Sequence, residues 1–184
     1  AIRGGATCLQ LREKDLSDQE LLERASEFVA ICRAGGAISV INDRCDVAMA
    51  SGADGVHVGQ DDIAVTTVRR LVGPDMVIGV STHNLEQARA AAQSGVDYVA
   101  IGPMYATSTK PRSFVAGIET LSNVRKNMSL PLVAIGGIDA ARAGDVMQAG
   151  ADCLCVCTAV TAHDDPESQA RAFSQHFAGA NAGA

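Results

Sequence analysis

The stretch Ser94-Gly95-Val96-Asp97-Tyr98-Val99-Ala100-Ile101 is the turn and strand of a unit that recurs along most of the chain. An Ala-rich amphipathic helix ends on glycine, a turn with aspartate follows, and a short apolar strand comes next. Related Gly-containing turns stand at residues 4–6, 35–37, 51–54 and 149–152. Strands that are apolar throughout and alternate with helices are typical of a parallel sheet covered by helices.

Seven strands are expected from this pattern. They are Cys8–Leu11, Ile38–Ile41, Gly55–Val58, Met76–Val80, Tyr98–Ile101, Leu132–Ile135 and Cys153–Val156. A closed (β/α)₈ TIM barrel has eight strands, and residues 1–4 read only as the last turn of a helix. We therefore expect an α/β protein with a TIM-barrel fold that lacks its first strand and most of its first helix. An open doubly wound sheet is the alternative.

Local signals mark where three helices begin. Ser17 to Glu20 forms a capping box for a helix that runs to about Arg33, and Asn84 opens a similar helix. Asp165-Pro166 places a cap before a first-turn proline, which predicts a last helix through about Phe177. The chain of 184 residues suggests one catalytic domain over residues 1–177, followed by a flexible tail over residues 178–184.

Composition narrows the partners and the compartment. The net charge is −6 and no basic run is present, which argues against nucleic acid and anionic membranes as partners. There is no apolar run long enough to span a bilayer and no signal peptide pattern. Three of the six cysteines alternate along one predicted strand, where they pair poorly, so we interpret them as small buried residues. A cytoplasmic protein is expected, and homo-oligomerisation stays open.

Polar residues follow the predicted strands, in contrast to the turn residues that precede them. After the first strand, Arg12 and Lys14 share one face with Gln10, because side chains alternate along a strand. A solvated edge strand or structural salt bridges would explain these cations, and so would an anion site. In a barrel, however, the carboxyl ends of all strands meet at one rim. Convergence there favours an anion site, with diphosphate as the missing partner.

Two acids are expected at the same rim. Asp43 and Asp62 would repel a diphosphate unless a metal ion lay between them, and Mg²⁺ is commonly held by one or two carboxylates plus substrate phosphates. The alternative role for both is that of a helix N-cap. Gly136-Gly137 frees backbone N–H groups after the Leu132–Ile135 strand, which suggests a second, monophosphate site.

Taken together, these motifs resemble the thiamine phosphate synthase family over essentially the whole chain. The matching stretches are Gln10–Lys14, Asn42-Asp43, His57–Asp62, Gly79–Ser81, Gly102–Tyr105, Thr107–Lys110 and Gly136–Ile138. The resemblance implies a transferase of thiamine biosynthesis. Such an enzyme joins 4-amino-2-methyl-5-hydroxymethylpyrimidine diphosphate to a thiazole phosphate, releases diphosphate and forms thiamine phosphate.

The resemblance also implies roles for individual residues. The pyrimidine diphosphate would be bound by Gln10, Leu11, Arg12, Glu13, Lys14, Asn42, Ser81 and Lys110, with Arg12, Lys14, Ser81 and Lys110 acting in catalysis. The thiazole phosphate would be bound by Thr107, Ser108, Thr109, Gly137, Cys157 and Thr158. Asp43 and Asp62 would hold Mg²⁺. The pair Cys157-Thr158 departs mildly from the family, which commonly has an aliphatic residue and serine there.

Two rival functions stay open. A thiazole tautomerase is a related barrel, but such relatives tend to lack the Gln-x-Arg-x-Lys set and carry histidine where Pro103 stands here. The second rival function is that of a non-catalytic binder of thiamine intermediates. No residue is expected as a covalent nucleophile, because the sequence offers no convincing Ser/His or Cys/His pair. His57, inside a strand, is interpreted as a packed or hydrogen-bonded structural histidine.

Overall fold

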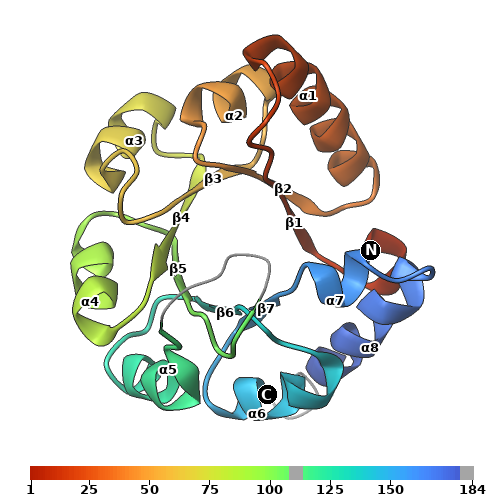
Figure 1. The fold of residues 1–184 in the computed structure, drawn as a ribbon. Helices are drawn as coiled ribbons and strands as arrows, with labels where there is room; N and C mark the ends of the chain where they lie inside the picture. Colours follow the sequence, from red (N-terminus) through yellow and green to blue (C-terminus); the bar gives the residue numbers. More distant parts are fainter. Residues whose placement is uncertain (108–113, 179–184) are drawn as a thin grey trace.

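The fold is known from a computed structural model, which describes residues 1–107 and 114–178. Strands and helices alternate along the chain, and the strands curl around a common axis with the helices outside them (Figure 1). The described residues contain one parallel sheet of seven strands in sequential order, from β1 to β7. This arrangement is the one expected of a TIM-barrel-like α/β protein, and it excludes a doubly wound sheet, whose strand order reverses.

The strands lie close to their expected positions. They are β1 (Cys8–Leu11), β2 (Ile38–Asn42), β3 (Gly55–Val58), β4 (Val77–Thr82), β5 (Tyr98–Ile101), β6 (Leu132–Ile135) and β7 (Cys153–Cys155). All seven expected strands are confirmed. The main difference is in β4, which continues through Ser81 and Thr82 because both residues still pair with β5.

The helices form the outer layer. They are η1 (Ile2–Gly4), α1 (Asp18–Ala34), α2 (Cys45–Ser51), α3 (Val65–Val72), α4 (Leu85–Gln93), α5 (Gly117–Lys126), α6 (Ala140–Gln148), α7 (Thr158–Thr161) and α8 (Pro166–Ala178). Each long helix turns small or branched apolar residues toward the sheet, such as Ala25 and Val29 of α1. These residues and the outward strand side chains, including Ile41, Val56 and Ile78, form the main core. The core therefore lies between the sheet and the helices.

The predicted helix starts are confirmed. The Ser17 hydroxyl accepts the N–H of Glu20, and the Glu20 carboxylate accepts the N–H of Ser17, so the capping box is complete. Asn84 caps α4, and Asp165 accepts the N–H of Ser168 at 2.9 Å at the start of α8. Helix α8 includes residue 178, which was expected to belong to the tail, and residues 179–184 lie outside the described part of the chain.

Aspartates at the amino ends of three strands connect those strands to their neighbours. Each carboxylate accepts a backbone N–H from the adjacent strand: Asp54 from Ser39 at 2.8 Å, Asp97 from Ile78 at 2.7 Å and Asp152 from Leu132 at 2.8 Å. The recurring turn aspartate of the sequence is therefore a strand-to-strand connector at the end of the sheet away from the polar rim.

Arg69 strengthens one of these connections. From α3, its guanidinium donates to Asp97 at 2.6 Å and to the carbonyl oxygen of Met76 at 2.7 Å. Charge-assisted hydrogen bonds of this kind contribute more than neutral ones. The cluster ties a helix, a turn and two strands together.

Replacing Asp97 by alanine should lower the free energy of unfolding by about 2 kcal/mol, since it removes two hydrogen bonds that involve a charged group. The arginine and the strand N–H of Ile78 lose their acceptor at the same time. Denaturant unfolding measures this change. Asp75→Ala, at an exposed carboxylate in the turn before β4, is the control, and equal midpoints for the two variants would contradict the assigned role.

Within residues 1–107 and 114–178, no helix is both long enough and apolar enough to cross a lipid bilayer.

Candidate functional site

The register of the sheet decides which side chains share its inner face. Asn42 pairs with His57, His57 with Gly79, and Gly79 with Tyr98, so these residues point to the same side. Ser81 lies two residues beyond Gly79 and takes that side too. The alternate residues, such as Val56 and Val80, belong to the outer core. The sheet therefore collects polar groups inside the curl, toward the carboxyl ends of its strands.

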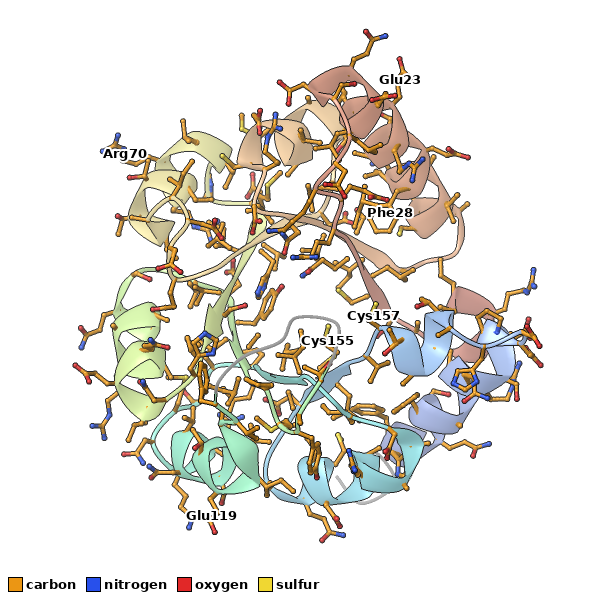
Figure 2. The ribbon with its side chains drawn as sticks, in the orientation of Figure 1. Glu23, Phe28, Arg70, Glu119, Cys155 and Cys157 are labelled. Atoms are coloured by element: carbon orange, nitrogen blue, oxygen red, sulfur yellow. The ribbon has the colours of Figure 1, made fainter. Side chains whose placement is uncertain are left out.

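Figure 2 shows the same division at the labelled residues. Cys155 lies toward the centre of the ring, whereas Glu23, Arg70 and Glu119 point away from it. Burial raises the pKa of the Cys155 thiol to about 12, so this side chain stays uncharged at neutral pH. All six cysteines are free. Cys153 and Cys155 are half-buried and Cys157 is exposed, so the interpretation of these three residues as small buried ones is wrong for Cys157.

The segment after β1 presents its cations to solvent at the rim. Gln10, Arg12 and Lys14 are exposed, which is compatible with an anion site and with a solvated edge strand alike. The two residues between them are engaged elsewhere: Leu11 packs against the core, and Glu13 accepts a hydrogen bond from Arg24 of α1 at 3.0 Å. Any contact of Leu11 or Glu13 with substrate would therefore involve their backbone.

Asp43 adopts an unusual backbone conformation directly after β2. Its φ is 63°, in the left-handed region, and among the described residues it is the one non-glycine residue with positive φ. The N–H of Asp43 donates to the His57 carbonyl at 2.8 Å. Arg44, not Asp43, is the N-cap residue of α2, so the capping alternative for Asp43 is wrong. Strain of this kind is concentrated at functional sites.

Asp62 lies in the loop that follows β3. Its carboxylate accepts the N–H of Gly59 at 2.6 Å, which fixes the loop against the end of the strand. The N-cap position of α3 is Ala64, so the capping alternative for Asp62 is wrong as well. Beside it, the Gln60 amide donates to the Ser81 carbonyl at 2.7 Å and joins this loop to β4.

The two acids fit a metal site that is completed by substrate. Asp43 and Asp62 follow adjacent strands at the same end of the sheet. The described residues hold no group of three or more His, Cys, Asp or Glu side chains that could bind a metal ion. Mg²⁺ is often held by only one or two carboxylates together with phosphate oxygens and water. The donors present match that mode.

Ser81 belongs to a hydrogen-bonded row that the sequence did not predict. Its hydroxyl lies 2.8 Å from Nε2 of His57, and Nδ1 of His57 lies 2.8 Å from the Tyr98 hydroxyl. His57 is buried, with 6% of its surface exposed, as its structural role predicted. The expectation that no Ser/His pair exists is wrong, because strands β3 and β4 bring the two residues together across 24 positions of sequence.

The glycine pair after β6 is packed against the loop after β5. Gly136 and Gly137 have φ of 96° and 68°. A Cβ at Gly137 would lie 2.7 Å from the Ala106 carbonyl oxygen, so only glycine fits there. Arg142 of α6 donates to the Gly137 carbonyl at 3.1 Å, and its guanidinium carbon lies 4.6 Å from the centre of the Tyr105 ring. The predicted monophosphate site thus has a fixed backbone.

The remaining predicted residues fall into two groups. Thr107 is half-buried, and Cys157 and Thr158 are exposed at the start of α7. Ser108, Thr109 and Lys110 lie outside the described residues. His83, which is not one of the predicted site residues, lies just before α4: its Nδ1 is 2.7 Å from the Gly102 carbonyl oxygen, and its backbone N–H donates to Gln87 at 2.9 Å.

No site role was expected for Tyr98 or Gly79, although Gly79 belongs to one of the matching motifs. Tyr98 stands at the amino end of β5, the end opposite the polar rim, and its long side chain reaches back toward β3. Side-chain alternation along β3 and β4 was the sequence feature that could have indicated this group, because it puts His57, Gly79 and Ser81 on one face of the sheet.

A curled parallel sheet with cations, an amide, hydroxyls and two carboxylates at its carboxyl ends defines a class of protein, a barrel-type enzyme that acts on phosphorylated small molecules. A family model described as thiamine monophosphate synthase matches residues 1–160. The chain belongs to this family. Both observations agree with the resemblance found in the motifs.

Individual relatives give the same result. A thiamine-phosphate synthase of Chloroflexus aurantiacus is 49% identical over 172 residues, which cover 93% of this chain and 79% of that protein. A thiamine-phosphate synthase of a Roseiflexus species is 41% identical over 181 residues, covering 98% and 77%. The solved thiamine phosphate pyrophosphorylase of Pyrococcus furiosus superposes with a TM-score of 0.90 at 31% identity, covering 97% of this chain and 86% of that one.

Proposed function

We propose that this protein is a thiamine-phosphate synthase that joins a pyrimidine methyl diphosphate to a thiazole phosphate and releases diphosphate. Membership of the family supports the reaction. The observation that carries it for this chain is the set of polar side chains on the inner face of the sheet, Gln10, Asn42, His57 and Ser81, together with the exposed cations Arg12 and Lys14 that follow β1. Cations and hydroxyls at one rim suit an anionic leaving group.

The rim residues would act mainly on the diphosphate. When the bond between the pyrimidine methylene carbon and the diphosphate oxygen breaks, negative charge develops on the diphosphate and positive charge on the methylene. Arg12, Lys14 and the Ser81 hydroxyl would stabilise the negative charge on the diphosphate. Asn42 and Gln10 would orient the substrate. The thiazole nitrogen then forms the new bond. Lys110 belongs to this proposal through the family resemblance, since it lies outside the described residues.

Mg²⁺ is proposed as the cofactor, held by Asp43 and Asp62. Bound there, it would neutralise charge on the leaving diphosphate. The chain's own contribution is to keep two carboxylates at adjacent strand ends, one in a constrained backbone and one fixed by Gly59. The thiazole phosphate would be bound by Thr107, Ser108, Thr109, Gly137, Cys157 and Thr158, through backbone N–H groups at Gly137.

The finer architecture is also a proposal. We interpret the seven strands as seven of the eight of a (β/α)₈ barrel, with the remaining strand's place between β7 and β1, which are the two edges of the described sheet. Residues 1–177 would form one catalytic domain. Six free cysteines and small phosphorylated substrates are consistent with a cytoplasmic enzyme.

Diphosphate release tests the reaction. With both substrates and Mg²⁺ present, the protein should release diphosphate and form thiamine phosphate in equal amounts. EDTA should abolish the release, and added Mg²⁺ should restore it, because the rim carboxylates otherwise repel the diphosphate. Binding of the pyrimidine diphosphate without turnover would contradict the proposal and favour a binder. Isomerisation of the thiazole alone would favour a tautomerase.

A further inference from the structure

The row of hydrogen bonds from Tyr98 through His57 to Ser81 connects three neighbouring strands, β5, β3 and β4. The Tyr98 hydroxyl and Nδ1 of His57 are 2.8 Å apart, and Nε2 of His57 and the Ser81 hydroxyl are also 2.8 Å apart. The two rings lie nearly parallel, with centroids 5.5 Å apart and an interplanar angle of 27°. Both nitrogens of the imidazole are thus committed.

Gly79 makes this row possible. A Cβ built on Gly79 would lie 1.9 Å from Cζ of Tyr98, so the tyrosine ring occupies the space that any other residue would fill. The ring crosses β4 at this glycine and brings its hydroxyl to His57 on β3. The hydrogen bond between Tyr98 and His57 therefore requires glycine at position 79.

The position of each proton follows from the partners. In the described part of the chain the Tyr98 hydroxyl has no hydrogen-bond partner besides His57, so its proton is satisfied only if it is donated to Nδ1. Burial raises the pKa of Tyr98, so the hydroxyl keeps that proton. A neutral His57 then carries its proton on Nε2 and donates it to the Ser81 oxygen. A protonated His57 also donates to Ser81 from Nε2.

We propose that His57 and Tyr98 are positioning residues that hold the Ser81 hydroxyl as a hydrogen-bond donor to the anionic leaving group. Because His57 donates to the Ser81 oxygen, the serine's own proton is directed elsewhere. In this arrangement His57 does not remove the serine proton, so the Ser/His pair is not a nucleophile. The inference rests on the proposed function, which supplies the diphosphate oxygen as the acceptor. A donor oriented in advance is most effective where charge develops during the reaction.

Nitrogen NMR of the histidines tests the proton arrangement without any substrate. With ¹⁵N-labelled histidine, the resonances of His57 are assigned by their absence from His57→Gln. We expect a protonated Nε2, with either an unprotonated Nδ1 or both nitrogens protonated. A protonated Nδ1 with an unprotonated Nε2 would overturn the proposal, since Ser81 would then donate to His57.

Kinetics test the functional consequence. Ser81→Ala should lower kcat about 100-fold, as loss of an oriented donor does. Tyr98→Phe and His57→Leu should each lower kcat about 10-fold with smaller effects on KM, whereas His57→Gln, which keeps a donor near Nε2, should retain most of the rate. His176→Gln, at an exposed histidine of α8, is the matched control. Thermal unfolding checks that each variant is folded.

A double-variant cycle tests whether Tyr98 acts through Ser81, separately from the proposed reaction. When Ser81 is already alanine, Tyr98→Phe should have almost no further effect on kcat. If it still lowers kcat by the same factor, Tyr98 does not act through Ser81 and the proposal is overturned. The proposed function fails in a different way, namely if the unaltered protein releases no diphosphate from the two substrates.

Discussion

Asp43→Asn should lower the turnover of the proposed reaction by at least 100-fold while the fold is retained. The variant removes one of the two carboxylates that the proposal gives to Mg²⁺, and loss of a group that stabilises developing charge typically costs about 10²–10³ in rate. Asparagine tolerates the left-handed backbone that residue 43 adopts, with φ of 63°. The measurement is diphosphate release at several Mg²⁺ concentrations, with a weaker apparent affinity for Mg²⁺ expected.

The backbone at residue 43 also decides which substitution is informative. Asp43→Ala should lower turnover as well, but an alanine with positive φ costs about 1 kcal/mol or more in stability. Asp43→Gly removes that strain together with the carboxylate. Asn and Gly variants that are folded and inactive would separate the chemical role from the structural one. Asp75→Asn, at the opposite end of the sheet, is the control, and unchanged turnover of Asp43→Asn would refute the assignment.

Lys14→Ala should lower kcat/KM for the pyrimidine diphosphate by about 10²–10³, by the same reasoning about a lost cation. Lys14 is exposed beyond β1, so its removal should leave the thermal midpoint nearly unchanged. Its charge should also contribute to the salt dependence of substrate binding. Added salt should therefore raise KM more in the unaltered protein than in the variant.

The controls for this second experiment come from the same chain. Lys126→Ala removes an exposed lysine at the end of α5, on the outer layer, and should change neither kcat nor KM. Arg12→Ala should resemble Lys14→Ala, because both cations follow the same strand on the same face. If Lys14→Ala and Lys126→Ala had equal kinetics, Lys14 would have no special role at the rim.

The sequence by itself determined the strands, the helix starts and which end of the sheet carries the polar residues. The four apolar residues of β5 and the capping box at Ser17 are local patterns, since each depends on residues a few positions apart. The rim followed from one topological rule about the carboxyl ends of parallel strands. The expected Mg²⁺ ligands and phosphate contacts, by contrast, rest on family resemblance and stay predictions.

Only the tertiary structure decided which side chains meet. His57 lies 41 positions from Tyr98 and 24 from Ser81, and they meet because β3, β4 and β5 pair in one register and Gly79 leaves space for the tyrosine ring. The left-handed backbone of Asp43 and the cluster of Arg69 with Asp97 are likewise absent from any local pattern. Side-chain alternation limits which face a residue takes, but contact across strands depends on register and on the volume of a third residue, and both are set by the assembled sheet.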